Sequence, residues 1–171
     1  MTAKKLLQVE EQIGASLQCE SNPPHRILVV DHDPYICHLS AEVLIRHGYE
    51  VNAAEDGAAA WEELQVNSYN LLITDQKIPK ISGVELLKKI HATRMVLPVI
   101  MTTKTLPTRK FTLHPWLQTA TMLRKPYTFE KLLGIVKNVF YATALVRAKI
   151  ALSPNRRNQS AAVGYYFDNR T

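Results

Sequence analysis

Residues 69–75 form the stretch that most limits the folds open to this chain. The segment reads YNLLITD, an apolar run without polar–apolar alternation that ends in the carboxylate of Asp75. Such a run is typical of a strand buried on both faces, and such strands occur almost only in parallel sheets covered by helices on both sides. Open α/β sheets bind their ligands beyond the carboxyl ends of the strands. The stretch therefore predicts an α/β fold with Asp75 at its ligand-binding edge.

Four more apolar runs, separated by helical patterns, extend this α/β pattern over residues 26–151. Each run is short enough for one strand, and most of the segments between them carry helix-start signals or apolar residues at helical spacing. Parallel strands joined by right-handed crossovers give a three-layer α/β/α sandwich around a five-stranded parallel sheet. The predicted strands are residues 27–30, 49–53, 69–75, 97–102 and 121–124.

Helix-start signals mark several of the connecting segments. Asp33 precedes Pro34, and proline is favoured in the first turn of a helix after an acidic cap. Ser82, with a glutamate three residues later, has the pattern of a capping box, and Thr128 is expected to cap a long last helix. The helix expected within residues 104–118 is poorly encoded because the segment contains two prolines, so we predict it to be short or distorted.

The composition is that of an ordinary globular protein. A chain of 171 residues with 46% hydrophobic and 21% charged residues suits one domain with a sizeable core. No apolar run reaches membrane-spanning length, and the N-terminus lacks the apolar stretch of a signal peptide. Cys19 and Cys37 form no CxxC pair, so we expect free thiols in a reducing compartment. We therefore expect a cytoplasmic protein that binds no membrane.

Both ends of the chain differ from the domain between them. Residues 1–25 contain a Pro-Pro linker and only a weak helical pattern, which predicts a flexible N-terminal arm. Residues 152–171 are rich in Pro, Asn, Arg, Gln and Ser, which predicts a basic, disordered tail. Most of the net charge of +6 lies near this end. A basic tail can contact nucleic acid, but no recognition helix is evident, so we expect the tail mainly to aid solubility.

Polar side chains end four of the five predicted strands, at Asp31, Asp75, Thr103 and Lys125. Because the carboxyl ends of parallel strands meet at one edge of the sheet, we expect these side chains to converge. Simpler roles are also open. Asp31 or Asp33 can cap the first helix, Thr103 can satisfy a strand end, and Lys125 can be a surface lysine. These separate roles do not explain the alignment of all four residues, whereas a shared site does.

Four segments carry a resemblance to a known family. They are residues 27–31 (ILVVD), Asp75 with the Ile-Pro and Gly that follow it, residues 98–103 (PVIMTT) and residues 125–127 (KPY). Each is a weak signal alone, but their order and spacing on a five-fold βα pattern are specific. Over residues 26–145 the chain resembles the receiver domains of two-component response regulators, the CheY-like superfamily. The resemblance implies a flavodoxin-like sheet with strand order 2-1-3-4-5.

The resemblance also implies roles for the strand-end residues. Asp75 stands at the position of the phosphoacceptor, which takes a phosphoryl group from a histidine kinase or phosphotransfer protein. Thr103 and Lys125 stand at the positions that contact the phosphoryl oxygens. The family's metal ligands correspond to Asp31, Asp75 and the backbone carbonyl of Lys77, which would hold Mg²⁺.

His32 is the main departure from the family pattern, because it stands where a second acidic residue usually ligates Mg²⁺. A neutral imidazole is a poor Mg²⁺ ligand and removes one negative charge. The next residue, Asp33, can substitute in part through a shifted loop or a water. Three outcomes stay open: weak Mg²⁺ binding with phosphotransfer, a preference for a softer ion such as Mn²⁺, or lost phosphotransfer. We favour weakened phosphoacceptance because Asp75, Thr103 and Lys125 are all present.

Two further departures fall in the region that relays the signal in the family. Lys104 follows Thr103 where the family has a small residue, so it can crowd Asp75, lend positive charge to a phosphate or remain solvated. Met122 stands three residues before Lys125, where many relatives have an aromatic that moves inward on activation. We therefore expect the switch region of Thr103, Lys104 and Met122 to differ from the usual one.

The expected function is that of a stand-alone bacterial receiver domain in a phosphorelay, phosphorylated on Asp75 and acting on a downstream protein by direct contact. We do not expect an enzyme, beyond slow loss of its own phosphoryl group. The alternative is a degenerate receiver that acts as an interaction module without phosphorylation. The long last helix and the N-terminal arm leave a homodimer open, and we expect no nucleic-acid partner.

Overall fold

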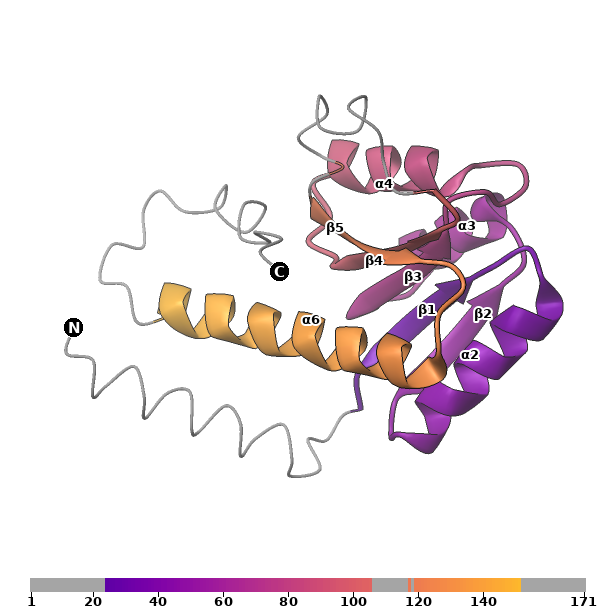
Figure 1. The fold of residues 1–171 in the computed structure, drawn as a ribbon. Coiled ribbons are helices and arrows are strands. Elements are labelled where there is room, and N and C mark those ends of the chain that lie inside the picture. Colours follow the sequence, from indigo (N-terminus) through magenta and orange to yellow (C-terminus); the bar gives the residue numbers. More distant parts are fainter. Residues whose placement is uncertain (1–23, 106–116, 118, 152–171) are drawn as a thin grey trace.

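A five-stranded parallel sheet lies at the centre of the part of the chain that the computed structural model describes, residues 24–105, 117 and 119–151 (Figure 1). The strands are β1 (Arg26–Val30), β2 (Glu50–Ala54), β3 (Leu71–Asp75), β4 (Val99–Thr103) and β5 (Ala120–Arg124). Their order is β2-β1-β3-β4-β5, and every neighbouring pair is parallel. The predicted fold class and strand order are therefore confirmed.

The burial of each strand follows its position in the sheet. β3 and β4 are buried at all five positions, as their unbroken apolar character predicts. β2 lies at one edge of the sheet and is only partly buried along most of its length, which confirms the edge position predicted for it. The strand that ends in Asp75 is thus central, and it has a covering layer on each face.

The described helices begin at the polar residues that the sequence marks. Asp33 and Asp56 cap the first two helices by accepting hydrogen bonds from backbone N–H groups of the first turn. Ser82 and Glu85 form a complete capping box at the third helix, and the hydroxyl of Thr128 accepts from the first turn of the last one. The helices are α2 (Pro34–Arg46), α3 (Gly57–Val66), α4 (Gly83–Ala92) and α6 (Phe129–Ala151).

Two apolar cores separate the three layers. One lies between the sheet and the pair α3 and α4, where Leu64 and Leu86 are buried. The other lies between the sheet and the pair α2 and α6, where Leu44 and Leu132 are buried (Figure 1). The predicted free thiol of Cys37 is buried in this second core, and burial raises the pKa of that thiol.

A close backbone approach holds α4 against the end of β3. A Cβ added to Gly83 would lie 2.3 Å from the carbonyl oxygen of Asp75, a distance that real Cβ atoms do not reach. The N–H of Gly83 also donates to the carbonyl of Gln76 at 3.1 Å. Only glycine permits this approach, so Gly83 fixes the backbone on which Asp75 stands.

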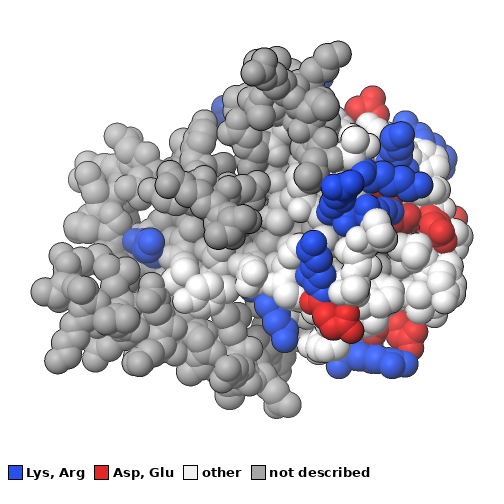
Figure 2. All heavy atoms as spheres, in the orientation of Figure 1, with Lys and Arg blue, Asp and Glu red and all other residues white. Residues whose placement is uncertain are grey.

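Several basic side chains on the described surface have acidic neighbours. Figure 2 shows Lys and Arg interspersed with Asp and Glu on the face that it presents. Lys80 pairs with Asp56 at 2.6 Å and Arg26 with Glu50 at 3.0 Å. The described part of that face is therefore mixed in sign.

Three predictions fall wholly or mostly on residues that the structure does not describe. These are the N-terminal arm in residues 1–23, the basic tail in residues 152–171 and most of the helix expected in residues 104–118. His25, which the sequence analysis placed in the arm, is described, and its ring stacks on Phe140 of α6 with centroids 4.3 Å apart. None of the described helices is both long enough and apolar enough to cross a membrane.

Candidate functional site

Three charged side chains meet at the carboxyl edge of the sheet. Asp75 is the last residue of β3, and Asp31 and Lys125 directly follow β1 and β5. The Nζ of Lys125 donates to Oδ2 of Asp31 at 2.8 Å and to Oδ2 of Asp75 at 3.0 Å. The parallel order of the strands brings these residues together although they lie 94 and 50 positions from Lys125 in the chain.

The two carboxylates of this cluster are largely removed from water. Asp31 is 5% exposed and Asp75 is 7% exposed. A carboxylate in such a place needs a charged partner, because the interior solvates it poorly. Burial alone would lower the pKa of Lys125, but its hydrogen bonds to Asp31 and Asp75 outweigh burial and hold that pKa above its ordinary value. Lys125 is therefore a fixed positive charge between the two carboxylates.

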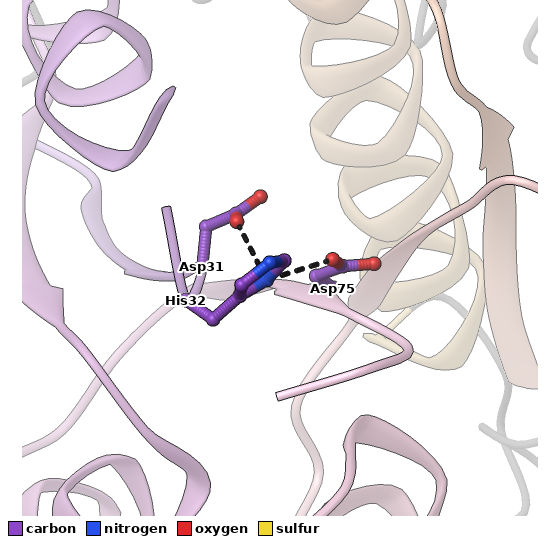
Figure 3. A group of neighbouring side chains, drawn as sticks. All are labelled: Asp31, His32 and Asp75. Atoms are coloured by element: carbon purple, nitrogen blue, oxygen red, sulfur yellow. Dashed lines mark ion pairs between the residues drawn. The ribbon is translucent and has the colours of Figure 1, made fainter. Parts of the chain in front are cut away.

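His32 lies between the same two carboxylates, on the side open to solvent (Figure 3). Its Nδ1 is 3.4 Å from Oδ1 of Asp31 and 3.4 Å from Oδ2 of Asp75, and its side chain is 51% exposed. One possible ligand atom from each of the three residues lies within 4.8 Å of the others. Two carboxylate oxygens and an imidazole nitrogen fit a divalent ion, and the nitrogen suits a transition metal better than Mg²⁺.

Asp33 has a different task. Its carboxylate accepts from the N–H of Tyr35 at 3.0 Å and from the N–H of Ile36 at 3.4 Å, at the start of α2. Its own N–H donates to Oδ1 of Asp31 at 3.1 Å. Asp33 thus starts the helix and orients Asp31, and His32 is the residue beside the carboxylate pair.

Thr103, the fourth strand-end residue, is directed away from this cluster. Its hydroxyl hydrogen-bonds the side chain of Gln76 and the carbonyl of Thr105, the latter at 2.8 Å. No hydrogen bond joins Thr103 to Asp75 within the described part of the chain. Side chains alternate between the faces of a sheet, and the register pairs Asp75 with Thr102. Thr103 therefore lies on the opposite face of the sheet from Asp75, although both residues are at the same edge.

Gln76 is the residue that the sequence analysis missed. It directly follows Asp75, and the β3–β4 register places Gln76 and Thr103 one step beyond the pair of Asp75 and Thr102. A prediction of how β3 and β4 pair, residue by residue, would have indicated this contact. The edge at which these residues lie could be predicted from the sequence, but the face of the sheet that each side chain occupies was not predicted.

The other candidate residues surround this edge. Lys77 and Lys104 are exposed just beyond β3 and β4. Met122 in β5 is partly buried and packs against the core on the α3 and α4 face. Thr102 is 2% exposed, and its hydroxyl has no hydrogen-bond partner among the described residues. A buried hydroxyl of this kind lowers stability, so Thr102 is a weak point beside the cluster.

Comparison with curated proteins finds relatives among regulatory proteins. The chain is 30% identical to the transcriptional regulatory protein CutR of Streptomyces coelicolor over 138 residues, which cover 77% of this chain and 64% of CutR. It is 39% identical to the chemotaxis protein CheY1 of Helicobacter pylori over 82 residues, or 46% of this chain and 66% of that protein. The chain thus spans less than two thirds of the length of either relative.

A solved structure agrees with these relatives. The response regulator protein TrrA from Thermotoga maritima, determined in complex with Mg²⁺ and BeF, is 31% identical, with a TM-score of 0.58 over 67% of this chain and 98% of that one. Residues 27–137 match the family described as the response regulator receiver domain, which is more than half of the chain. The strand order and the relatives point the same way. The chain therefore belongs to the response regulator receiver domains, the CheY-like domains of two-component signalling.

Proposed function

We propose that Asp75 accepts a phosphoryl group from the phosphohistidine of a histidine kinase or phosphotransfer protein. One oxygen of its carboxylate forms the new P–O bond while the P–N bond to the donor imidazole breaks, and the released imidazole takes up a proton. The observation that carries this proposal is Lys125, whose Nζ bridges Asp31 and Asp75 at the carboxyl edge of the sheet. An ammonium group at that place can balance the charge of the incoming phosphoryl oxygens.

The residues around Asp75 also fit a divalent cation. Receiver domains bind Mg²⁺ through acidic residues, and Asp31, His32 and Asp75 form a group in this chain that can hold a metal. A divalent cation bound by these side chains and the carbonyl of Lys77 would neutralise charge on the phosphoryl oxygens. Because one of the three side chains is an imidazole, we propose that the site binds Mg²⁺ weakly and prefers Mn²⁺.

The proposed output is contact with a downstream protein. The described residues form one sheet with its helices, and a change of their surface is a means of signalling that they offer. We propose a cytoplasmic receiver in a phosphorelay that acts on a downstream protein by direct contact, with the folded domain in residues 26–151. Slow loss of its own phosphoryl group would be its only catalysis.

Phosphorylation can be tested by intact-protein mass spectrometry after incubation with a small acyl phosphate, in parallel samples with Mg²⁺ and with Mn²⁺. We expect one phosphoryl group on the protein, a higher yield with Mn²⁺, and no adduct on Asp75→Asn. Asp33→Asn is the matched control, since asparagine caps a helix as well as aspartate does, and it should still be phosphorylated.

A second candidate function is a degenerate receiver that binds partners without phosphorylation. The observation that favours it is His32, which removes an acidic group from beside Asp75. The same mass spectra decide between the two functions. If neither metal supports an adduct on the folded protein, phosphoacceptance is wrong and the interaction module is the better description.

A further inference from the structure

The hydroxyl of Thr103 is held by Gln76 and Thr105. The hydroxyl contacts the side-chain amide of Gln76, it lies 2.8 Å from the carbonyl oxygen of Thr105, and it accepts from the N–H of Thr105 at 3.2 Å. Thr103 is 2% exposed, so water does not compete freely for these bonds. The residue expected to contact a phosphoryl group is thus occupied elsewhere in this state.

The one proton of this hydroxyl is already engaged. A threonine hydroxyl has one proton to donate and two lone pairs that accept. The Thr103 hydroxyl faces two acceptors, Oε1 of Gln76 and the carbonyl oxygen of Thr105, and its single proton serves these two. The hydroxyl oxygen accepts from the N–H of Thr105. Thr103 therefore has no proton to donate to an anion on Asp75 unless the hydroxyl leaves these acceptors.

The backbone on both sides of this contact is fixed. The N–H of Gln76 donates to the carbonyl of Thr102 at 2.9 Å, and its own carbonyl accepts from Gly83 at 3.1 Å. On the other side, the N–H of Lys125 donates to the carbonyl of Thr103 at 2.8 Å. The meeting of the two side chains is therefore a property of the sheet register and of the start of α4.

We propose that Gln76 is a positioning residue that retains Thr103 in the unphosphorylated arrangement. This inference rests on the proposed function, in which Thr103 contacts a phosphoryl group on Asp75. Thr103 must leave Gln76 before it can reach that group, so the amide of Gln76 biases the domain against the phosphorylated arrangement. When a ligand binds only the rearranged form, its apparent affinity is the intrinsic affinity multiplied by the fraction of molecules in that form.

The inference can be tested with beryllofluoride as a phosphoryl mimic, in the presence of Mn²⁺. Gln76→Met replaces the amide by an apolar group of similar length, and we expect it to tighten beryllofluoride binding by about threefold to tenfold, the effect of one net hydrogen bond. Gln65→Met makes the same change on the exposed face of α3 and should leave the affinity as it is. Binding of Mn²⁺ alone should be equal in all three proteins.

If Gln76 acts by positioning Thr103, the effect of Gln76→Met must require the Thr103 hydroxyl. A general effect on folding or charge would not require it. In a Thr103→Val background, Gln76→Met should no longer tighten beryllofluoride binding, whereas Thr103→Ser should preserve the gain. A gain that persists in Thr103→Val overturns the inference, as does equal binding by the wild type and Gln76→Met. If the wild type binds Mn²⁺ but no beryllofluoride, the proposed function itself fails, and this inference fails with it.

Discussion

The carboxyl edge of the sheet has two halves that differ in how far they are assembled. In the charged half, Lys125 already bridges Asp31 and Asp75. In the hydroxyl half, Thr103 is bound to Gln76 and does not reach Asp75. Strand alternation explains the difference, because it places neighbouring residues of one strand on opposite faces. Charge compensation is thus built into the folded state, while the proposed contact of the Thr103 hydroxyl with a phosphoryl group on Asp75 would require a movement.

Removing Lys125 should produce the largest effect, because it dismantles the charged half. Lys125→Met leaves two carboxylates buried without their cation, and breaking such a pair costs about 3–5 kcal/mol of unfolding free energy. Urea unfolding near neutral pH measures this loss. Lys131→Met, at an exposed position in α6, is the matched control and should change stability by less than about 0.5 kcal/mol. Equal stability of the two variants would show that the carboxylates do not depend on Lys125.

The same lysine should give the protein a characteristic alkaline limit. The pKa of Lys125 is raised in the folded state above its ordinary value of 10.5, so the folded protein holds this proton more tightly than the unfolded chain does. The associated stability is complete below pH 10.5 and is lost as pH rises through the folded pKa. We expect urea midpoints of the wild type to fall over that range, and those of Lys125→Met to fall less.

The close backbone approach between α4 and the end of β3 can be tested by replacing glycine with alanine. In Gly83→Ala the new Cβ would lie 2.3 Å from the carbonyl oxygen of Asp75, so α4 or the end of β3 must shift. We expect a loss of about 1–3 kcal/mol by thermal or urea unfolding. Gly134→Ala in α6 meets nothing within 4 Å and should stabilise the protein by about 0.5–1 kcal/mol. A loss of stability in both variants would contradict this account of Gly83.

His32 is the point at which the charged half can be restored to the family pattern. His32→Asp adds a carboxylate beside Asp31 and Asp75, so the metal-free protein should lose stability. Mg²⁺ should bind about tenfold more tightly. The gain is limited because water screens most of the attraction between the added carboxylate and the cation. Calorimetric titration with Mg²⁺ measures the gain, with Asp33→Asn as the matched control that should leave the affinity unchanged. An unchanged Mg²⁺ affinity in His32→Asp would show that another group already supplies the missing charge.

The smallest effect distinguishes two neighbouring threonines. Thr102→Val removes a buried hydroxyl that has no partner among the described residues and should raise the unfolding free energy by roughly 1 kcal/mol. Thr103→Val removes a hydroxyl with partners on two sides and should lower it by roughly the same amount. Paired urea titrations test the opposite signs. Two losses would mean that the Thr102 hydroxyl makes a stabilising contact after all.

The fold was readable from the sequence because its signals are local. The unbroken apolar run before Asp75, the Asp33 cap and the capping box at Ser82 each report on a few adjacent residues, and each is confirmed. The order of the strands followed from the family resemblance and is also confirmed. Local periodicity and chain topology together therefore suffice to place strand ends at a common edge.

The side-chain contacts within the site could not be predicted from local sequence signals. Asp33 can cap a helix or face the metal group, depending on the course of the backbone over residues 31–33. The sequence was compatible with both. The contact between Gln76 and Thr103 depends on the register of two strands that lie far apart in the chain. Register and side-chain direction arise from packing over the whole sheet, which no short segment encodes.

Cys37 gives experimental access to the timing of events at this edge. The thiol lies in α2, the helix that begins next to Asp31 and His32, and it is buried with a raised pKa. A thiol in that condition reacts with alkylating reagents only while the helix is transiently detached. Its labelling rate therefore reports how often α2 opens, and whether metal or a phosphoryl mimic at the site slows that opening.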